Sequence, residues 1–394
     1  MEKLRFFNSD LPHNVLSRLP TKTLLGLKCV SKGWHKIISE RSFIQDQLQK
    51  HKPIISGFIF QGKYQWCNED IKIVSYIPVE SKVSQVQQMV FDFLPEVVVI
   101  LASCNGLVCC RSCFPAQDPA IYVCNPSNKQ WIRLNSAKPD QHSTIGLVFD
   151  PARDPVNIST KFKLVRVKQL KIEEKEEEEL YYTFEVYSLE TGTWTKSNEI
   201  CHCNSNLVKN KSVYVGGILH WQTNGDKVLT YHVENELSWL ISVPVPATEF
   251  NTIPEACIGD SEGKLHYVMI SEEGLHIWFL EDYFEIQWTL KYSKSLLEIE
   301  EEHPRFYNLH ERVTQRVTYD MDPWMVPLAF KDGLLLMRVS AKLYLYHIET
   351  GMMKGSLRSC QIGSKLHVLS CGASLFHELG SVESGIGRSS SVDF

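Results

Sequence analysis

A repeated pattern after residue 100 limits the fold more than any other feature of this sequence. In each copy a turn leads into an apolar strand, a second strand follows, and a polar turn ends in an aromatic strand end. Units of this length with paired strands predict a β-propeller in which each unit forms one blade. Five copies are clear, at residues 105–134, 162–197, 216–241, 262–290 and 331–357.

Tryptophan follows the polar turn in four of the five copies. The four are Trp131, Trp194, Trp239 and Trp288, with spacings of 63, 45 and 49 residues. The fifth copy has methionine at this place. Because a lone blade cannot bury both of its faces, several blades must stack. We therefore expect these tryptophans to pack between blades.

The two ends of the body predict a sixth blade. Residues 53–60 and 71–78 have the composition of strands, as do residues 365–376 near the C-terminus. Pairing the first and last strands in one blade would close the ring and remove exposed sheet edges. The expected total is thus about six blades.

The first 50 residues differ from the body in both pattern and charge. Leu24, Leu27, Val30, Trp34 and Ile37–Ile38 recur at steps of three and four, which predicts helices with one apolar stripe. Residues 1–50 carry a net charge of +5 and the remaining residues carry −10. This basic, amphipathic head indicates a module that docks on an acidic partner. The alternative is that the helices simply pack on the following domain.

Three residues place the expected helices. Asp10 opens a short first helix, Pro20 suits the first position of a second, and Ser31 can cap a third. So few short helices bury too little surface to be stable alone.

The head resembles an F-box of the plant type. The motifs Leu11-Pro12, Arg18-Leu19-Pro20, Cys29-Val30 and Trp34 occur together in the family's order, over about residues 9–48. In that family the F-box binds a Skp-type adaptor, which links it to a cullin scaffold. The resemblance implies these adaptor-binding residues: Leu11, Pro12, Leu16, Leu19, Pro20, Leu24, Leu25, Val30 and Trp34.

The head departs from the family in one respect. Five residues, His13 to Ser17, separate the Leu-Pro and Arg-Leu-Pro motifs, where the family usually has about nine. The missing four residues correspond to about one helical turn. We expect a shorter first helix and weaker adaptor binding than a full-length F-box gives.

The body resembles the kelch-like F-box-associated domain, over roughly residues 55–377. The matching motifs include "SCNGLVCC" from Ser103, "YVCNPSNKQW" from Tyr122 and "GGILHW" from Gly216. Propellers of this kind usually recruit a substrate. The expected fold is therefore an α+β multidomain chain, with an F-box (1–48), a linker (49–54), an all-β kelch-like propeller of about six blades (55–379) and a disordered tail (380–394).

The sequence predicts no catalytic residue, no metal site and no cofactor. Cys104, Cys109, Cys110 and Cys113 lack the paired CxxC spacing of zinc knuckles, and Cys109 and Cys110 should point to opposite faces of a strand. Nucleophile elbows, HExxH helices and phosphate loops do not occur. His220, His266 and His276 lie in apolar strands, where we expect core or inter-blade positions.

Two further segments can be interpreted as purely structural or as functional. The acidic run at residues 173–179 reads as a solvated hairpin loop, or as a contact for a basic substrate. "CHC" at residues 201–203 could place two thiols on one side of a strand. Trp66, Tyr283 and Trp324 are candidate exposed aromatic residues for binding a target.

These features predict a non-catalytic, substrate-recognition subunit of a Skp–cullin–F-box ubiquitin ligase. Two alternatives stay open: an F-box protein that acts outside the ligase, and a propeller enzyme. The partners would be the adaptor, through it the cullin, and an unknown protein substrate, with no nucleic acid and no membrane. The absence of a signal-peptide pattern and of an apolar run of about 20 residues favours the cytoplasm, the nucleus or both.

Overall fold

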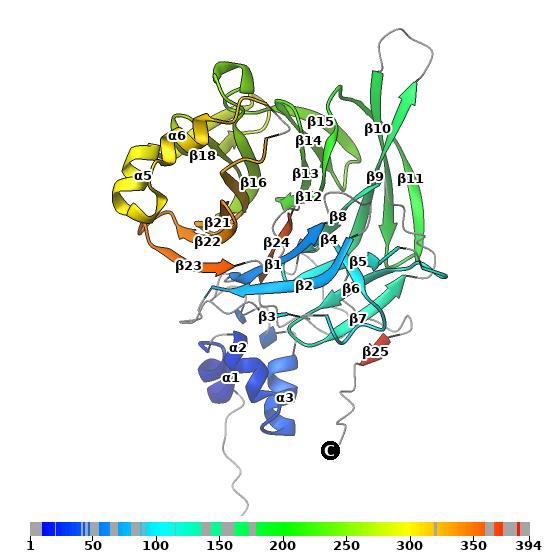
Figure 1. The fold of residues 1–394 in the computed structure, drawn as a ribbon. Coiled ribbons are helices and arrows are strands. Elements are labelled where there is room, and N and C mark those ends of the chain that lie inside the picture. The colour runs from blue at the N-terminus through cyan, green and yellow to red at the C-terminus, as the bar shows by residue number, and fades with distance from the viewer. Residues whose placement is uncertain are drawn as a thin grey trace, which may run out of the picture.

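The chain folds into a small group of helices beside a ring of β-sheets (Figure 1). The computed structural model describes residues 10–19, 21–40, 42–43, 46–47, 55–63, 70–79, 87–88, 91–114, 116–134, 143–150, 161–172, 179–318, 321–358, 366–372 and 384–386. In the view of Figure 1 the N-terminal helices lie below the sheet that contains β1 and β2.

The N-terminal module contains three short helices. They are α1 (Asp10–Leu16), α2 (Thr21–Leu27) and α3 (Lys32–Ser39). The expected cap of the third helix is confirmed, because the Ser31 hydroxyl accepts a hydrogen bond of 3.1 Å from the backbone N–H of Trp34. The expected start of the first helix at Asp10 is confirmed too. Pro20 lies outside the described residues.

In the first half of the described body, the strands form three antiparallel blades of four. Blade 1 contains β24 (Leu366–Gly372), β1 (Ile55–Lys63), β2 (Asp70–Pro78) and β3 (Gln87–Gln88). Blade 2 contains β4 (Val98–Cys104), β5 (Leu107–Ser112), β6 (Ile121–Asn125) and β7 (Gln130–Leu134). Blade 3 contains β8 (Thr144–Val148), β9 (Lys163–Ile172), β10 (Glu179–Ser188) and β11 (Thr193–His202).

Three more blades follow in the second half of the described body. Blade 4 contains β12 (Leu207–Val215), β13 (Ile218–Thr223), β14 (Lys227–His232) and β15 (Leu237–Ser242). Blade 5 contains β16 (Glu255–Ser261), β17 (Lys264–Ser271), β18 (Gly274–Asp282) and β19 (Gln287–Lys294). Blade 6 contains β20 (Met325–Lys331), β21 (Leu334–Val339), β22 (Lys342–His347) and β23 (Met353–Arg358).

The first strand of each blade lines the centre of the ring. β24, β4, β8, β12, β16 and β20 each lie beside the next, and β20 lies beside β24. The ring closes as the sequence predicts, because β1 pairs with β2 on one side and with β24 on the other. Phe58, for example, lies opposite Ile77 and Ser370. The chain therefore holds its ends together by strand pairing within blade 1.

Blades 5 and 6 are joined more closely than this general scheme requires. β16 and β20 pair in parallel, with Gly259 opposite Phe330 and Asp260 opposite Lys331, so the two blades form one eight-stranded sheet. A Cβ atom at position 259 would clash with the carbonyl group of Phe330. Glycine is therefore required where these two central strands meet.

Hydrophobic clusters shared between neighbouring blades form the core. Within the described residues, each of the six blade-to-blade contacts has one such cluster. The expected role of the tryptophans is confirmed: all four pack against these clusters, and the indole N–H of Trp288 donates a bond of 2.8 Å to the Ser242 carbonyl of blade 4. The blades thus depend on each other for burial.

The expected fold, F-box helices followed by a β-propeller, is confirmed, and the body is mostly β. The sequence pattern did not predict α5 (Leu296–Glu302), the 3₁₀ turn η2 (Pro304–Phe306) and α6 (Leu309–Thr314), which separate β19 from β20. A short 3₁₀ turn, η1 (Ala247–Glu249), also precedes β16. In the tail that was expected to be disordered, β25 (Ser384–Ile386) pairs with β7 at the outer edge of blade 2.

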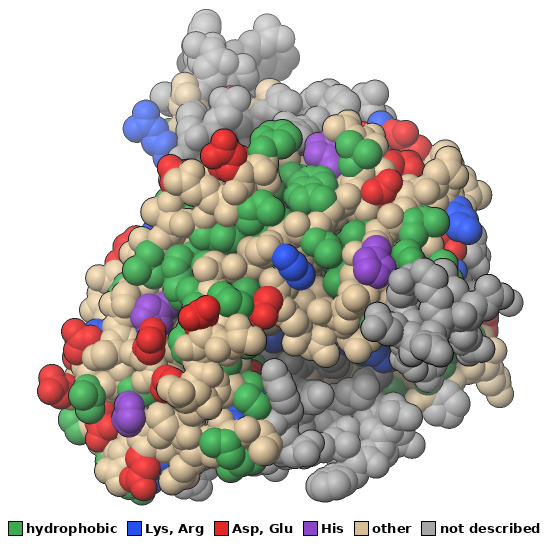
Figure 2. Space-filling view, turned by 90° about the horizontal axis from the view of Figure 1, so that it is seen from above, with side chains coloured by type: hydrophobic (Ala, Val, Ile, Leu, Met, Phe, Trp, Pro, Cys, Tyr) green, Lys and Arg blue, Asp and Glu red, His purple; other side chains and the backbone are tan. Residues whose placement is uncertain are grey.

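A capping box explains why α5 begins where it does. The Ser295 hydroxyl accepts a bond from the Glu298 N–H, and the Glu298 carboxylate accepts one from the Ser295 N–H. The Glu300 carboxylate of α5 accepts hydrogen bonds from the backbone N–H groups of Asn308 and Leu309 at the start of α6. Figure 2 shows Asp and Glu side chains gathered at the end of the molecule that carries α5 in Figure 1.

The acidic run lies between two paired strands, as the sequence predicts. β9 and β10 are antiparallel, with Ile172 opposite Glu179, and their hairpin extends away from the ring in Figure 1. The connecting residues 173–178 lie outside the described residues.

Candidate functional site

The N-terminal module has a core of its own. Leu16 of α1, Leu24 of α2, Ile38 of α3 and Phe43 are buried together. Leu19, Leu27 and Ile37 pack around them and are partly buried. The apolar side chains of all three helices thus converge on one small interior.

Other apolar side chains of the module face solvent. Val30 is 65% exposed and Trp34 is 37% exposed, and Val15 of α1 is also exposed. The expectation of one continuous apolar stripe is therefore wrong: Leu24 and Ile38 turn inwards, whereas Val30 and Trp34 turn outwards. These exposed apolar side chains make this part of the module a candidate contact surface.

The predicted adaptor-binding residues consequently fall into three groups. Leu16 and Leu24 are buried inside the module and are not on its surface, and Leu19 is partly buried. Val30 and Trp34 are available on the surface. The remaining positions lie outside what the structure describes, namely the side chains of Leu11, Pro12 and Leu25 and the whole of Pro20.

Polar contacts tie α1 to the residues after α3. The His13 Nε2 atom lies 3.0 Å from a carboxylate oxygen of Asp46, and the His13 ring contacts Phe43 edge-on. The Gln47 amide donates a bond of 2.9 Å to the Leu19 carbonyl. Both α1 and the turn that follows it, at Leu19, are therefore held by contacts with the residues after α3.

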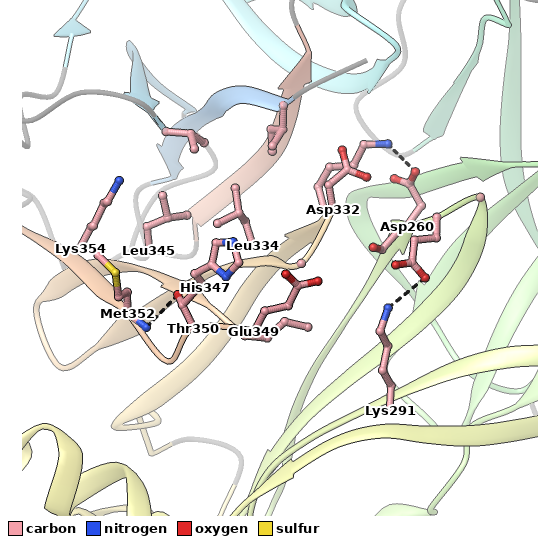
Figure 3. A pocket seen from close by; sticks show the side chains of 18 of the residues that line it. Asp260, Lys291, Asp332, Leu334, Leu345, His347, Glu349, Thr350, Met352 and Lys354 are labelled. Atoms are coloured by element: carbon pink, nitrogen blue, oxygen red, sulfur yellow. Dashed lines mark hydrogen bonds and ion pairs between the residues drawn. The ribbon is translucent and has the colours of Figure 1, made fainter. Parts of the chain in front are cut away.

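The propeller carries a hollow between blades 5 and 6 with a volume of about 740 Å³ (Figure 3). It is formed by the turns between β16 and β17, β20 and β21, and β22 and β23, together with Ile55 at the start of β1. This volume lies within the range of ligand-binding sites in proteins, about 300–1,000 Å³. The hollow is thus large enough to hold several side chains of a bound molecule.

Two ion pairs lie along one side of the hollow. Lys331 pairs with Asp260, and the Lys291 Nζ atom lies 3.1 Å from a Glu262 carboxylate oxygen (Figure 3). Burial acts to lower the pKa of Lys331, but the Asp260 and Asp332 carboxylates together outweigh it, so that the pKa lies above its ordinary value. Both lysines are therefore already paired with carboxylates.

The other side of the hollow combines an apolar floor with unpaired polar groups. Leu334, Leu345 and Ile348 contribute buried apolar surface. Glu349 is exposed in the turn after β22, and among the described residues its carboxylate has no ion pair or hydrogen bond. The Nδ1 atom of His347 is buried and has no hydrogen-bond partner in the described part of the chain.

Sequence reasoning missed this hollow. Its turns belong to the repeated pattern, as "KDGLL" after β20 and "HIETGM" after β22 show. Nothing in the pattern says which turns face each other, because that depends on blade order and ring closure.

The cysteines occupy apolar positions. Cys109 belongs to the cluster between blades 2 and 3 and Cys110 to the cluster between blades 1 and 2, so their expected opposite directions are confirmed. Burial raises the pKa of both thiols, which keeps them protonated. Cys201 and Cys203 share one cluster, as the alternation of a strand predicts. The described residues contain no group of three or more His, Cys, Asp or Glu side chains that could hold a metal ion.

The expected positions of two histidines are confirmed. His220 is fully buried: its Nδ1 atom lies 3.1 Å from the Val213 carbonyl and its Nε2 atom 3.1 Å from the Tyr283 hydroxyl of blade 5. The carbonyl accepts from Nδ1–H, so Nε2 accepts from the hydroxyl. Burial lowers the pKa of His220 to about 4. His266 is buried between Phe279 and Phe330 of the next blade.

The candidate exposed aromatic residues are not confirmed as a surface. Tyr283 turns inwards to His220, and Trp324 is covered by the guanidinium group of Arg312, 4.3 Å from its ring. Trp66 lies outside the described residues. Phe284, the neighbour of Tyr283, is the exposed one, with 98% of its surface accessible.

Among the helices of the described residues, none has the length and apolar character needed to cross a membrane.

Comparison with known families agrees with both parts of the molecule. The three-helix module lies in front of a closed six-bladed ring, and an F-box domain model matches it over residues 9–46, so the chain is an F-box protein with a β-propeller. The chain belongs to the family described as "F-box protein At3g26010-like, beta-propeller", whose model matches residues 58–308, more than half of the chain.

Curated proteins of Arabidopsis thaliana are similar over most of their length. "F-box protein At5g49610" is 25% identical over 310 residues, which are 75% of this chain and 80% of that protein. "F-box protein At5g07610" is 26% identical over 304 residues, covering 73% and 70% of the two chains. "F-box/kelch-repeat protein At3g23880" is 24% identical over 375 residues, covering 87% and 90%. The similarity therefore covers most of this chain and most of each relative.

Proposed function

We propose that this chain is the substrate-recognition subunit of a Skp–cullin–F-box ubiquitin ligase. The observation that carries the proposal is the order of the two parts: an F-box with exposed apolar residues precedes a self-contained propeller. An F-box implies binding to a Skp-type adaptor in general. The propeller would hold a target protein, so that a ubiquitin-charged enzyme on the cullin acts on it at high effective concentration.

In this proposal the exposed residues of the module contact the adaptor. Val15, Val30 and Trp34 supply apolar surface, and Lys32 and Lys36 on α3 supply positive charge for an acidic partner. The buried residues Leu16 and Leu24 act indirectly, by holding the three helices together. The chain itself contributes no catalytic group, and it works in the cytoplasm, the nucleus or both.

Calorimetric titration of the purified chain with a Skp-type adaptor tests the proposal. Val30→Asp is expected to raise Kd about tenfold or more, because it places a charge in the apolar contact. Val317→Asp is the matched control, since Val317 has the same exposed fraction as Val30, 65%, and lies beyond α6 in the propeller. Circular dichroism must show that both variants fold. No binding by the folded wild-type chain, or equal binding by all three, would exclude the proposed docking surface.

The short first helix favours one alternative, an F-box protein that acts outside the ligase. α1 has seven residues and offers little length for the adaptor. Inserting one helical turn after Asn14 is expected to tighten adaptor binding, and unchanged affinity would show that the shortening has no effect. In a reconstituted mixture that contains both adaptor and cullin, the wild-type chain can be tested by pull-down. If it pulls down the adaptor but not the cullin, the alternative replaces the ligase proposal.

A further inference from the structure

We propose that the hollow between blades 5 and 6 binds an extended segment of the target, in which a large apolar side chain stands next to a lysine or arginine. This inference rests on the proposed function, because it names the kind of segment that the propeller recognises. Three observations support it: the apolar floor, the charge of the lining and the position of the hollow relative to the F-box.

The floor of the hollow fits an apolar side chain. Leu334, Leu345 and Ile348 lie along it, and Met352 stands exposed at its edge (Figure 3). A buried Leu, Met or Phe side chain gains about 1.5–3 kcal/mol from leaving water. Methionine adapts to side chains of different shape, which suits an edge that closes over a ligand.

The charge of the lining favours a basic neighbour for that apolar side chain. Lys331 and Lys291 are occupied by Asp260 and Glu262. The third lysine of the lining, Lys354, lies on the far side of Met352 from Glu349 (Figure 3), so it leaves the Glu349 side of the hollow without a competing cation. Glu349, by contrast, has no charged partner in the described part of the chain, and Figure 3 shows its carboxylate directed into the hollow. A lysine or arginine of the bound segment would supply the missing partner through a charge-assisted hydrogen bond.

The hollow also lies close to the F-box along the chain. Ile55 lines it, and Gln47 is the last described residue of the F-box. Eight residues span at most about 29 Å even when fully extended. A segment held in the hollow would thus stay near the adaptor, as proximity-driven transfer requires.

Selection from a phage library of random short peptides, on the full chain bound to the adaptor, identifies the segment. We expect enrichment of peptides in which Leu, Ile, Met or Phe is adjacent to Lys or Arg. Repeating the selection on Glu349→Arg should shift the adjacent residue to Asp or Glu. Selection of no peptides, or of the same peptides on both chains, would overturn the proposal.

Fluorescence polarisation of one selected peptide gives the quantitative test. Glu349→Gln is expected to raise Kd about tenfold, because a charged hydrogen bond is lost. Glu285→Gln is the matched control: Glu285 is also exposed in the turn between the last two strands of a blade, but it does not line the hollow. Equal losses in both variants would contradict the site. Adaptor affinity measured on the same samples separates this failure from failure of the ligase proposal.

Discussion

The F-box and the propeller solve the same problem, the burial of apolar side chains, in different ways. The F-box has one small cluster, and Val30 and Trp34 are left on its surface. In the described propeller, every blade shares clusters with both neighbours. The described blades can therefore bury their apolar side chains against each other, whereas the F-box leaves apolar side chains exposed to solvent. This difference supports the proposal that a partner covers the exposed apolar residues of the F-box, whereas the propeller buries its core within its own ring.

Removing β24, the last central strand, should have the largest effect, because it should destabilise the propeller while leaving the F-box intact. A chain that ends at residue 365 lacks β24, which leaves the inner edge of blade 1 without its partner. We expect loss of the cooperative unfolding transition of the propeller and aggregation through exposed strand edges. Scanning calorimetry and light scattering measure both.

A second truncation controls for the loss of residues as such. A chain that ends at residue 386 keeps β24 and β25 and should unfold as the full chain does. A cooperative transition in the shorter chain would show that ring closure does not distinguish the propeller from the F-box.

Deleting a shared core side chain should have the next largest effect. Trp221 is fully buried between blades 3 and 4, and Trp221→Ala is expected to lower the free energy of unfolding by about 3–5 kcal/mol. Phe284→Ala removes a large but exposed ring and should change it by less than about 0.5 kcal/mol. Urea titration measures both. Similar values for the two variants would mean that inter-blade burial does not stabilise the ring.

Acid should weaken the propeller through His220. The unfolded chain binds a proton at this residue below pH about 6.5, but the folded chain does so only near pH 4, because burial lowers the pKa. The free energy of unfolding should therefore fall between pH 6.5 and 4, by about 3 kcal/mol for this group. Above pH 6.5 His220 is neutral in both the folded and the unfolded chain, so it adds no pH dependence to the free energy of unfolding.

A variant isolates this contribution. His220→Gln should flatten the pH dependence of the propeller transition, even if it is less stable at neutral pH. Thr230→Val alters a buried residue of the same blade without a titrating group, and should lower stability equally at every pH. An unchanged slope in His220→Gln would refute the role of the imidazole.

The smallest expected effect compares one helix cap in each region. Ser31 caps α3 of the F-box and Ser295 caps α5 of the propeller. Replacing either serine by alanine should cost about 1 kcal/mol in the unit that contains it. Hydrogen exchange of the two helices measures this separately. If Ser31→Ala weakens exchange protection in α5 as well, the two regions are not independent.

Sequence alone predicts the architecture because its signals are local. The glycine turns and tryptophans repeat once per blade, and the Ser31 cap lies within one turn of its target N–H. α5 carries an equally local signal, Ser295 three residues before Glu298. It was not predicted, because it lies between two copies of a repeat that otherwise indicates strands. Local patterns of either kind can be read without knowing the fold.

The candidate binding sites are harder to predict because they combine distant residues. Helical periodicity groups Val30 with Leu24, yet only the packing of three helices against Phe43 decides which of them is buried. Ile55 and Leu334 meet in the hollow only after the ring closes. Such juxtapositions follow from tertiary structure, which periodicity does not specify.

The pairing of β1 with β24 has a consequence for the order of events on the ribosome. Ile55–Lys63 must wait for Leu366–Gly372, about 300 residues later, before blade 1 can form. At about 5–20 residues per second, this wait lasts roughly 15–60 seconds. The F-box has emerged in full long before. If it binds an adaptor as proposed, a nascent chain can meet that adaptor before blade 1 has closed the ring.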